Sequence, residues 1–159
     1  MYKRIVRAKV RSTFARINDG DYMAMVDGLA ASFEYRFHGD HALGGRRTTR
    51  AAMIRWWERV VDLLPGARFD IQDILVNGGP WRTRVAVRSY VSGDLPGGVR
   101  YENTVFQFLT LEWGRVTSVE TVEDLQVLGR ALRAVADAGK PEALAGPISD
   151  GETSSGLPR

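Results

Sequence analysis

Both histidines of the chain lie in one short segment, FEYRFHGDHALGG, which covers residues 33–45. A neutral imidazole is the best general base near neutral pH, because its ordinary pKa is close to neutrality. His41 follows a predicted strand in a glycine-flanked loop, and such loops often present catalytic groups at a cavity mouth. We therefore predict that His41 is a catalytic base assisted by Asp40. Consecutive side chains usually diverge, however, so Asp40 fits a residue that orders the loop equally well, and His38 is predicted to lie at the surface.

A second set of polar candidates lies in the run YENTVFQFLTLEWG. Tyr101, Asn103 and Gln107 share one face of a strand, because alternate side chains point the same way. Amides among apolar neighbours fix the orientation of a neutral ligand, and a tyrosine hydroxyl such as that of Tyr101 or Tyr35 can donate to a developing enolate. Two alternatives stay open: the amides satisfy backbone groups or a subunit contact, and the tyrosines are core residues with one satisfied hydroxyl.

Other aromatic and acidic residues have two interpretations each. Trp56 and Trp57 are consecutive and lie ~100° apart on a helix, so Trp57 is assigned to the core while Trp56 either lines a cavity or covers its edge. Glu123 and Asp124 precede the last helical run, where carboxylates favour the positive helix end, and we predict that they start that helix rather than form an acid–base pair. Asp73 is either an inward-facing acid or a bulge residue.

Composition limits the chemistry further. The chain has 159 residues and no cysteine, which excludes disulfides, thiol nucleophiles and zinc thiolate sites. A reducing compartment is allowed by this composition, and we predict a cytoplasmic protein. No metal site and no cofactor are predicted. The net charge of +3 arises from basic residues on helix and strand faces opposite apolar stripes, which is typical of solvated faces, so no nucleic-acid partner is expected. No run resembles a signal peptide or a membrane span, so we expect a non-exported protein without a membrane partner.

Hydrophobic spacing predicts the elements that position these residues. Apolar residues recur at helical spacing over residues 6–17 and again over 22–29, where Asp21 is a capping candidate. Alternation over residues 33–38 predicts a short strand. The segment TTRAAMIRWWERVVDLLPG, residues 48–66, predicts a helix that opens on a threonine cap and stops at a Pro-Gly pair.

From residue 68 onward the chain is rich in β-forming residues. Four runs separated by glycine turns predict an antiparallel meander, in which the three arginines of the second strand must face outward because burying them unpaired is prohibitive. A helix over residues 125–135 follows. Residues 139–159 are rich in Gly, Pro and Ser, which predicts a flexible tail after a domain of residues 1–138.

Helices followed by strands favour an α+β fold, in which a curved antiparallel sheet wraps around N-terminal helices as a cone with one apolar cavity. In this order, the segments FHGDHALGG, LLPGARFDIQDILVNGG and YENTVFQFLTLEWGRVTSVETVEDLQ resemble the SnoaL-like branch of the nuclear-transport-factor-2-like superfamily, over about residues 3–136. The resemblance implies the cone-shaped fold. This superfamily includes polyketide cyclases, steroid isomerases, epoxide hydrolases and noncatalytic binders, so the fold does not fix the reaction. Alignment with the hydrolase branch places Thr121 where its water-activating aspartate would be, with Arg88 but no aspartate nearby, which disfavours epoxide hydrolysis.

The leading functional hypothesis is therefore an isomerase, cyclase or lyase that moves a proton next to a carbonyl of an apolar cyclic, polyketide-like or terpenoid molecule. His41 with Asp40 would move the proton while an inward polar group holds the enolate. The predicted ligand-binding residues are Tyr35, Trp56, Tyr101, Asn103 and Gln107. The alternative is a noncatalytic ligand-binding or dimerisation module with the same cavity. The outward arginine row predicts a homodimer through the sheet.

Overall fold

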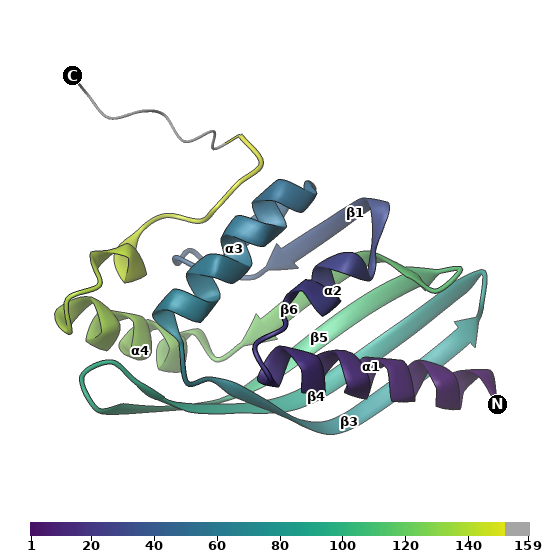
Figure 1. The fold of residues 1–159 in the computed structure, drawn as a ribbon, viewed down its shortest axis with the longest axis horizontal. Helices are drawn as coiled ribbons and strands as arrows, with labels where there is room; N and C mark the ends of the chain where they lie inside the picture. Colours follow the sequence, from purple (N-terminus) through teal and green to yellow (C-terminus); the bar gives the residue numbers. More distant parts are fainter. Residues whose placement is uncertain (152–159) are drawn as a thin grey trace.

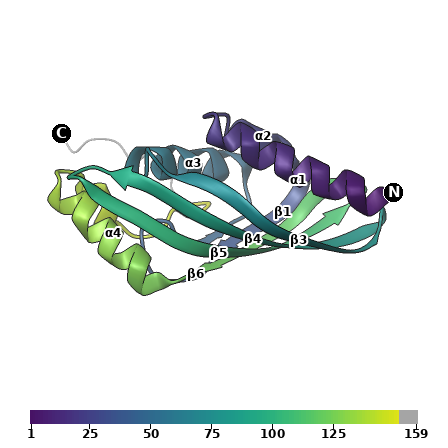
Figure 2. The ribbon, with the colours of Figure 1, turned by 90° about the horizontal axis from the view of Figure 1, so that it is seen from below.

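A computed structural model describes residues 1–151 and shows a six-stranded sheet with helices packed on its concave face (Figures 1 and 2). The elements are α1 (Tyr2–Asn18), α2 (Met23–Asp27), β1 (Leu29–Phe37), β2 (Gly45–Arg47), α3 (Arg50–Leu63), β3 (Arg68–Gly79), β4 (Arg82–Leu95), β5 (Val99–Glu112), β6 (Arg115–Glu123), α4 (Leu125–Asp137) and a short 3₁₀ helix, η1 (Pro141–Leu144). Figure 2 shows α1, α2 and α3 along one side of the sheet, with α4 at the end away from the N-terminus.

The strand order in the sheet is β2-β1-β6-β5-β4-β3. Strands β3 to β6 form the predicted antiparallel meander, and the predicted α+β cone is confirmed. One pair differs from a purely antiparallel sheet, because β1 joins the meander parallel to β6, with Tyr35 beside Val119. The three-residue strand β2, which is too short to leave a pattern in the sequence, extends the sheet beyond β1.

Local sequence explains where the helices begin and end. The side chain of Thr49 accepts a hydrogen bond from the amide of Ala52 at the start of α3, as the threonine cap predicted. The second helix is shorter than predicted: it ends at Asp27, and Leu29 already belongs to β1. Asp21 does not cap it, because its carboxylate pairs with Arg16 instead.

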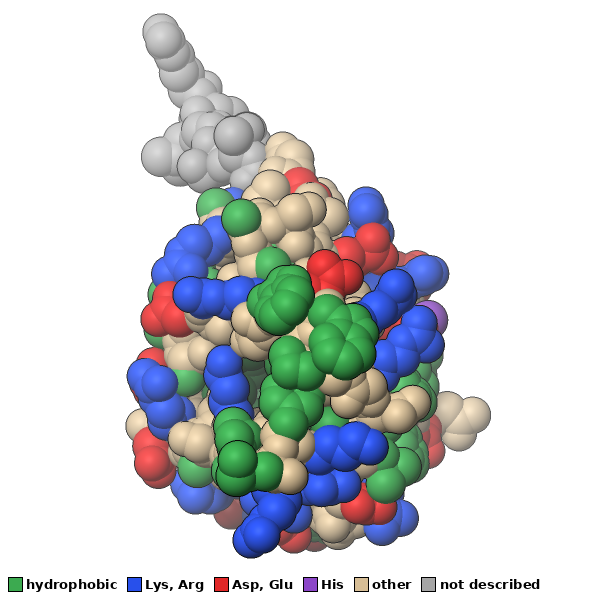
Figure 3. All heavy atoms as spheres, turned by 90° about the vertical axis from the view of Figure 1, so that its right-hand side faces the viewer, with side chains coloured by type: hydrophobic (Ala, Val, Ile, Leu, Met, Phe, Trp, Pro, Cys, Tyr) green, Lys and Arg blue, Asp and Glu red, His purple; other side chains and the backbone are tan. Residues whose placement is uncertain are grey.

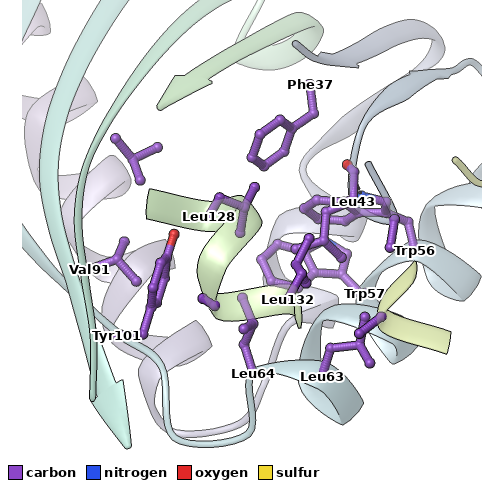
Figure 4. Close-up of a cluster of buried hydrophobic side chains, with 14 of the residues drawn as sticks. Phe37, Leu43, Trp56, Trp57, Leu63, Leu64, Val91, Tyr101, Leu128 and Leu132 are labelled. Atoms are coloured by element: carbon purple, nitrogen blue, oxygen red, sulfur yellow. Dashed lines mark hydrogen bonds between the residues drawn. The ribbon is translucent and has the colours of Figure 1, made fainter. Parts of the chain in front are cut away.

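Two clusters of buried apolar side chains hold the helices on the sheet. The smaller cluster joins α1 to β3 and β4 and includes Val85 and Val87, which face inward as predicted while the arginines of β4 face outward. The larger cluster lies between α3, α4 and the inner face of β1, β5 and β6 (Figure 4). Trp57 is buried in it and stacks on Tyr22, as the core assignment predicted.

The segment after α4 differs from the flexible tail predicted from residue 139. Ala143 and Ile148 are buried, and the carbonyl of Ile148 accepts a hydrogen bond from the Arg47 guanidinium. The Asp150 carboxylate accepts hydrogen bonds from the backbone and hydroxyl groups of Thr48 and Thr49. Residues 143–150 therefore pack on the domain through the buried Arg47 and through the exposed Asp150 carboxylate, while the domain boundary at residue 138 stays a prediction. The rest of the predicted tail, residues 152–159, lies outside the described residues.

The hairpin end of the molecule, as we call the first turn of α1 with the β3–β4 and β5–β6 turns, carries exposed apolar side chains (Figures 1 and 3). A hydrogen bond from the amide of Trp113 to the carbonyl of Pro80 joins the two turns, and the hydroxyls of Tyr2 and Thr83 join α1 to them. In Figure 3 apolar side chains gather at this end, with Lys and Arg side chains around them. No helix within residues 1–151 is long and apolar enough to cross a membrane.

Candidate functional site

A cavity of about 390 Å³ lies between the three N-terminal helices and the inner face of the sheet. Its wall is mainly apolar and includes Phe37, Trp56 and Trp57, which Figure 4 shows opposite Tyr101. Polar groups enter the wall from the sheet. They are Tyr35, Tyr101, Gln107, Thr121 and Glu123.

Strand geometry explains why these polar side chains meet. Thr121 and Glu123 are two residues apart on β6, so both point to the inner face. The register of β5 places Gln107 beside Thr121 and Val105 beside Glu123. Side chains on neighbouring strands at such positions lie in contact, so the polar groups form a continuous row along one wall of the cavity.

Glu123 and Tyr101 form a buried hydrogen-bonded pair. The Tyr101 hydroxyl donates to Glu123 Oε1 over 2.7 Å and accepts from the amide Nδ2 of Asn103 over 3.2 Å. Asn103 also donates to the carbonyl of Asp124 and accepts from the amide of Thr104, so its side chain is fully used behind Tyr101. Asn103 therefore positions the tyrosine and does not line the cavity wall.

This environment favours proton transfer by Glu123. Burial, and to a smaller degree the charge of Asp124, raise the pKa of the Glu123 carboxyl from 4.5 to about 7, while the hydrogen bond from Tyr101 opposes the shift. Burial and the Glu123 charge raise the pKa of Tyr101, so this phenol stays protonated. A carboxyl group whose pKa is close to neutral pH can both accept and return a proton.

The hydroxyls of Tyr35 and Thr121 form a second polar pair in the cavity, and one of their two protons has no protein acceptor. The oxygens of Tyr35 and Thr121 are 3.2 Å apart, and Gln107 Nε2 donates to Thr121 Oγ1 over 3.1 Å. Only one of the two hydroxyl protons can lie between the two oxygens, and no further hydrogen-bond acceptor for either hydroxyl is found among residues 1–151. Burial raises the pKa of Tyr35 to about 12, so its proton is retained. The pair therefore offers a spare donor to a ligand.

The predicted histidine site lies elsewhere. The amide of Leu43 donates to His41 Nδ1 over 3.2 Å, so Nε2 carries the proton and donates to the carbonyl of His38 over 3.0 Å. Burial lowers the pKa of His41, which keeps this tautomer neutral. Neither histidine is among the described residues that line the cavity, and Asp40 is exposed in the loop. The geometry offers His41 no free nitrogen toward the cavity, so its catalytic role stays a prediction.

Trp56 is held at the cavity wall by a buried arginine that the sequence pattern does not reveal. The indole Nε1 donates to the carbonyl of Leu43 over 2.8 Å. The fully buried guanidinium of Arg47 lies over the rings of Tyr35 and Trp56, 5.4 and 5.2 Å from their centroids. Burial lowers the pKa of Arg47 to about 10. Backbone carbonyls, including that of Gly44, accept its hydrogen bonds in place of a carboxylate.

The structure thus brings together four of the predicted ligand-binding residues and adds one that was missed. Tyr35, Trp56, Tyr101 and Gln107 line the cavity, as predicted from strand and helix faces. Glu123 was assigned to a helix start, but Asp124 alone caps α4, accepting from the amides of Gln126 and Val127. The alternation of β6, in which Glu123 shares a face with Thr121, was the signal that could have placed it inside.

Two remaining acidic or basic candidates lie outside the site. Asp73 is exposed at a register shift of β3, which confirms the bulge interpretation. Arg88 points to the outer face of the sheet, away from Thr121, so the groups needed for epoxide opening do not converge.

The chain thus forms an α+β cone around an apolar cavity with polar groups on one wall, an arrangement typical of small-molecule pockets. The sequence profile of the SnoaL-like domain matches residues 10–119, and the chain belongs to this family. No curated protein sequence matches the chain significantly.

Solved structures share the fold at low sequence identity. An NTF2-like protein of unknown function from Burkholderia pseudomallei is 16% identical with a TM-score of 0.69, over 79% of this chain and 95% of that one. IdmH, a proposed polyketide cyclase from Streptomyces antibioticus, is 19% identical with a TM-score of 0.64, over 80% and 97%. TerC, crystallised with polyporic acid, is 19% identical with a TM-score of 0.62, over 78% and 95%.

Proposed function

We propose that this protein transfers a proton at a carbon next to the carbonyl of an apolar cyclic molecule, of a polyketide-like or terpenoid kind. The observation that carries the proposal is the position of Glu123, a buried carboxyl with a pKa of about 7, two residues along the same cavity wall from a hydroxyl pair with a spare proton. An enzyme of this kind needs a base for the carbon and a donor for the oxygen that becomes an enolate.

The spacing of the two groups suits such a ligand. Residues two apart on a strand are ~6.5 Å apart, and this distance accommodates a hydrogen bond to a carbonyl oxygen, the carbonyl itself and a carbon facing the carboxylate. Glu123 would remove the proton from that carbon, the Tyr35–Thr121 pair would donate to the enolate oxygen, and Glu123 would return the proton to the same or a neighbouring carbon. The Tyr101 hydroxyl, already bonded to Glu123, would orient the base.

Proteins with a similar fold support a cavity for small ligands, although they do not identify the ligand of this protein. TerC was crystallised with polyporic acid, and IdmH is a proposed polyketide cyclase. The aromatic wall of Trp56, Trp57 and Phe37 fits a flat or cyclic apolar molecule in this chain.

Deuterium exchange into 2-tetralone tests the proposal, because this apolar bicyclic ketone carries acidic protons on the benzylic carbon beside its carbonyl. We expect the protein to accelerate exchange above the buffer rate in deuterium oxide, measured by proton NMR. Glu123→Gln removes the base while keeping shape, so it should lower the catalysed exchange ~10²–10⁴-fold. Exchange at the wild-type rate in this variant would contradict the assignment of the base.

The second candidate is a noncatalytic ligand-binding module, which the absence of both histidines from the described cavity wall favours. Binding of 2-tetralone, followed by quenching of tryptophan fluorescence, without exchange above the buffer rate would favour this candidate. The cytoplasmic location expected from the sequence stays a prediction.

We also propose that two copies pair through the outer face of the sheet. Leu75, Phe106 and Phe108 are exposed there beside Arg84 and Glu120, a mixture of apolar and oppositely charged groups that suits a self-complementary contact. Light scattering at micromolar concentration should show a dimer, and Phe108→Asp should shift it to monomer. A wild-type protein that is monomeric throughout would exclude the pairing.

A further inference from the structure

The hairpin end joins apolar and basic side chains from three distant segments. Trp81 and Trp113 are 65% and 76% exposed at the two turns, and Ile5 is 58% exposed on α1 beside them. Trp113 has a positive φ of 49°, and its backbone amide donates a hydrogen bond to the carbonyl of Pro80. Lys9 also joins α1 to the β5–β6 turn, because its ammonium donates a hydrogen bond to the carbonyl of Gly114 over 3.1 Å.

The charge of this end is strongly one-sided. Residues 1–9, 79–83 and 111–116 contain six basic residues and one acidic residue, Glu112. The cations at the end itself are Lys3, Arg4, Lys9, Arg82 and Arg115. None of these five forms an ion pair with another of the described residues. Unpaired cations around exposed tryptophans complement an anionic surface that also accepts apolar side chains.

The cavity reaches the same end. Its wall runs along α1 and includes Tyr2, Ile5, Lys9 and Gly114, so the cavity continues from the buried polar row toward the hairpin end. An apolar ligand held in such a cavity partitions into bilayers, because burial of apolar surface drives both events.

We propose that the hairpin end docks on the surface of an anionic lipid bilayer, with Trp81 and Trp113 at the headgroup level, the five cations on lipid phosphates and the cavity opening toward the lipid. Docking of this kind needs no membrane-spanning segment. The sequence gives no sign of this membrane contact, because the start of α1 and the two turns are far apart in the chain and come together only in the folded protein. A bilayer fits better than a protein partner, since the apolar groups project from turn tips and form no groove.

Vesicle co-sedimentation of the full chain tests this docking. Vesicles of phosphatidylcholine with about 30 mol % phosphatidylglycerol should retain the protein and pure phosphatidylcholine vesicles should not, and retention should weaken as salt rises above about 0.1 M. The double variant Trp81→Ala/Trp113→Ala and the double variant Lys3→Glu/Arg4→Glu should each weaken binding at least about tenfold. Each altered side chain is exposed, and thermal melting should confirm that both variants fold.

Matched controls lie at other surfaces. Leu144→Ala removes an equally exposed apolar side chain, and Arg130→Glu/Arg133→Glu reverses two exposed charges on α4; both should bind as the wild type does. The proposal is overturned if anionic vesicles retain no protein or if the tryptophan variant binds undiminished. It is also overturned if the chain binds single-stranded DNA and leaves the vesicles in the supernatant. Quenching of wild-type fluorescence by brominated lipids, lost in the tryptophan variant, would support it.

Discussion

The cavity wall at Glu123 and the loop at His41 both carry titratable groups that suit acid–base chemistry, yet the fold uses them differently. Glu123 is bonded through one oxygen to Tyr101 and lines the cavity. His41 has both nitrogens bonded to the backbone of its own loop. Because a base needs a free atom that faces the ligand space as well as a suitable residue type, we expect Glu123 rather than His41 to act as the base.

The largest effect that separates the two regions should appear in catalysed exchange of 2-tetralone. Glu123→Gln should lower it ~10²–10⁴-fold, whereas His41→Ala and Asp40→Asn should stay within about threefold of the wild type, because neither lines the cavity. NMR measurement of exchange for all three variants, with melting curves to confirm folding, decides the comparison. Loss of exchange in His41→Ala with full retention in Glu123→Gln would reverse it.

A second effect tests whether the cavity wall supplies the spare hydroxyl proton. Tyr35→Phe leaves the Thr121 proton free for a ligand and Thr121→Val leaves the Tyr35 proton free, so each single variant should keep exchange within about tenfold. The double variant loses both donors and should fall ~10²–10³-fold, which is the effect of removing an oxyanion donor. Additive losses in the two single variants would show that the hydroxyls do not substitute for one another.

A third effect concerns stability at alkaline pH. The pKa of Glu123 is raised on folding from 4.5 to about 7, so the native state binds this proton more tightly than the unfolded chain. The resulting stabilisation is complete below about pH 4.5 and is lost as the pH rises through 7, at ~1.4 kcal/mol per pKa unit. Glu123→Gln, which carries no charge, should therefore be ~2–3 kcal/mol more stable than the wild type at alkaline pH and similar in acid. Urea titrations at both pH values measure this difference.

The smallest effect is a loss of stability in acid rather than in alkali, and it comes from His41 in the loop after β1. Because burial lowers the pKa of His41, the folded loop favours the neutral ring, and this contribution is present above the ordinary pKa and lost as the pH falls through the lowered value. Protonated Nδ1 cannot accept from the amide of Leu43. The NMR signal of the His41 ring should titrate below pH 6.5, with faster hydrogen exchange at Leu43 in acid. A ring that titrates above 6.5 would contradict the packing described.

Strand periodicity allowed much of this site to be predicted from the sequence. Alternation put Tyr101, Asn103 and Gln107 on one face of a strand, and amides among apolar neighbours favoured that face for the cavity. Glu123 was missed because a carboxylate before an amphipathic run usually caps a helix. Its side chain points inward because β6 continues as far as this residue, so that Glu123 shares a face with Thr121. The buried Arg47 could not be foreseen, because one of its acceptors, the carbonyl of Ile148, is about a hundred residues away in the sequence, and Trp56 beneath its guanidinium belongs to another element.

The parallel pairing of β1 with β6 has a consequence for the order in which the protein is made. Residues 29–37 are synthesised before β3, β4 and β5, whereas their sheet partner, residues 115–123, is synthesised after those strands. Until then β1 has no place in the meander, and Tyr35 cannot meet Thr121. Contacts between such distant segments form slowly because a long loop must close first. A nascent chain that ends before residue 115 can therefore form the β3–β5 hairpins, while the ligand cavity exists only after residues 115–123 have been made.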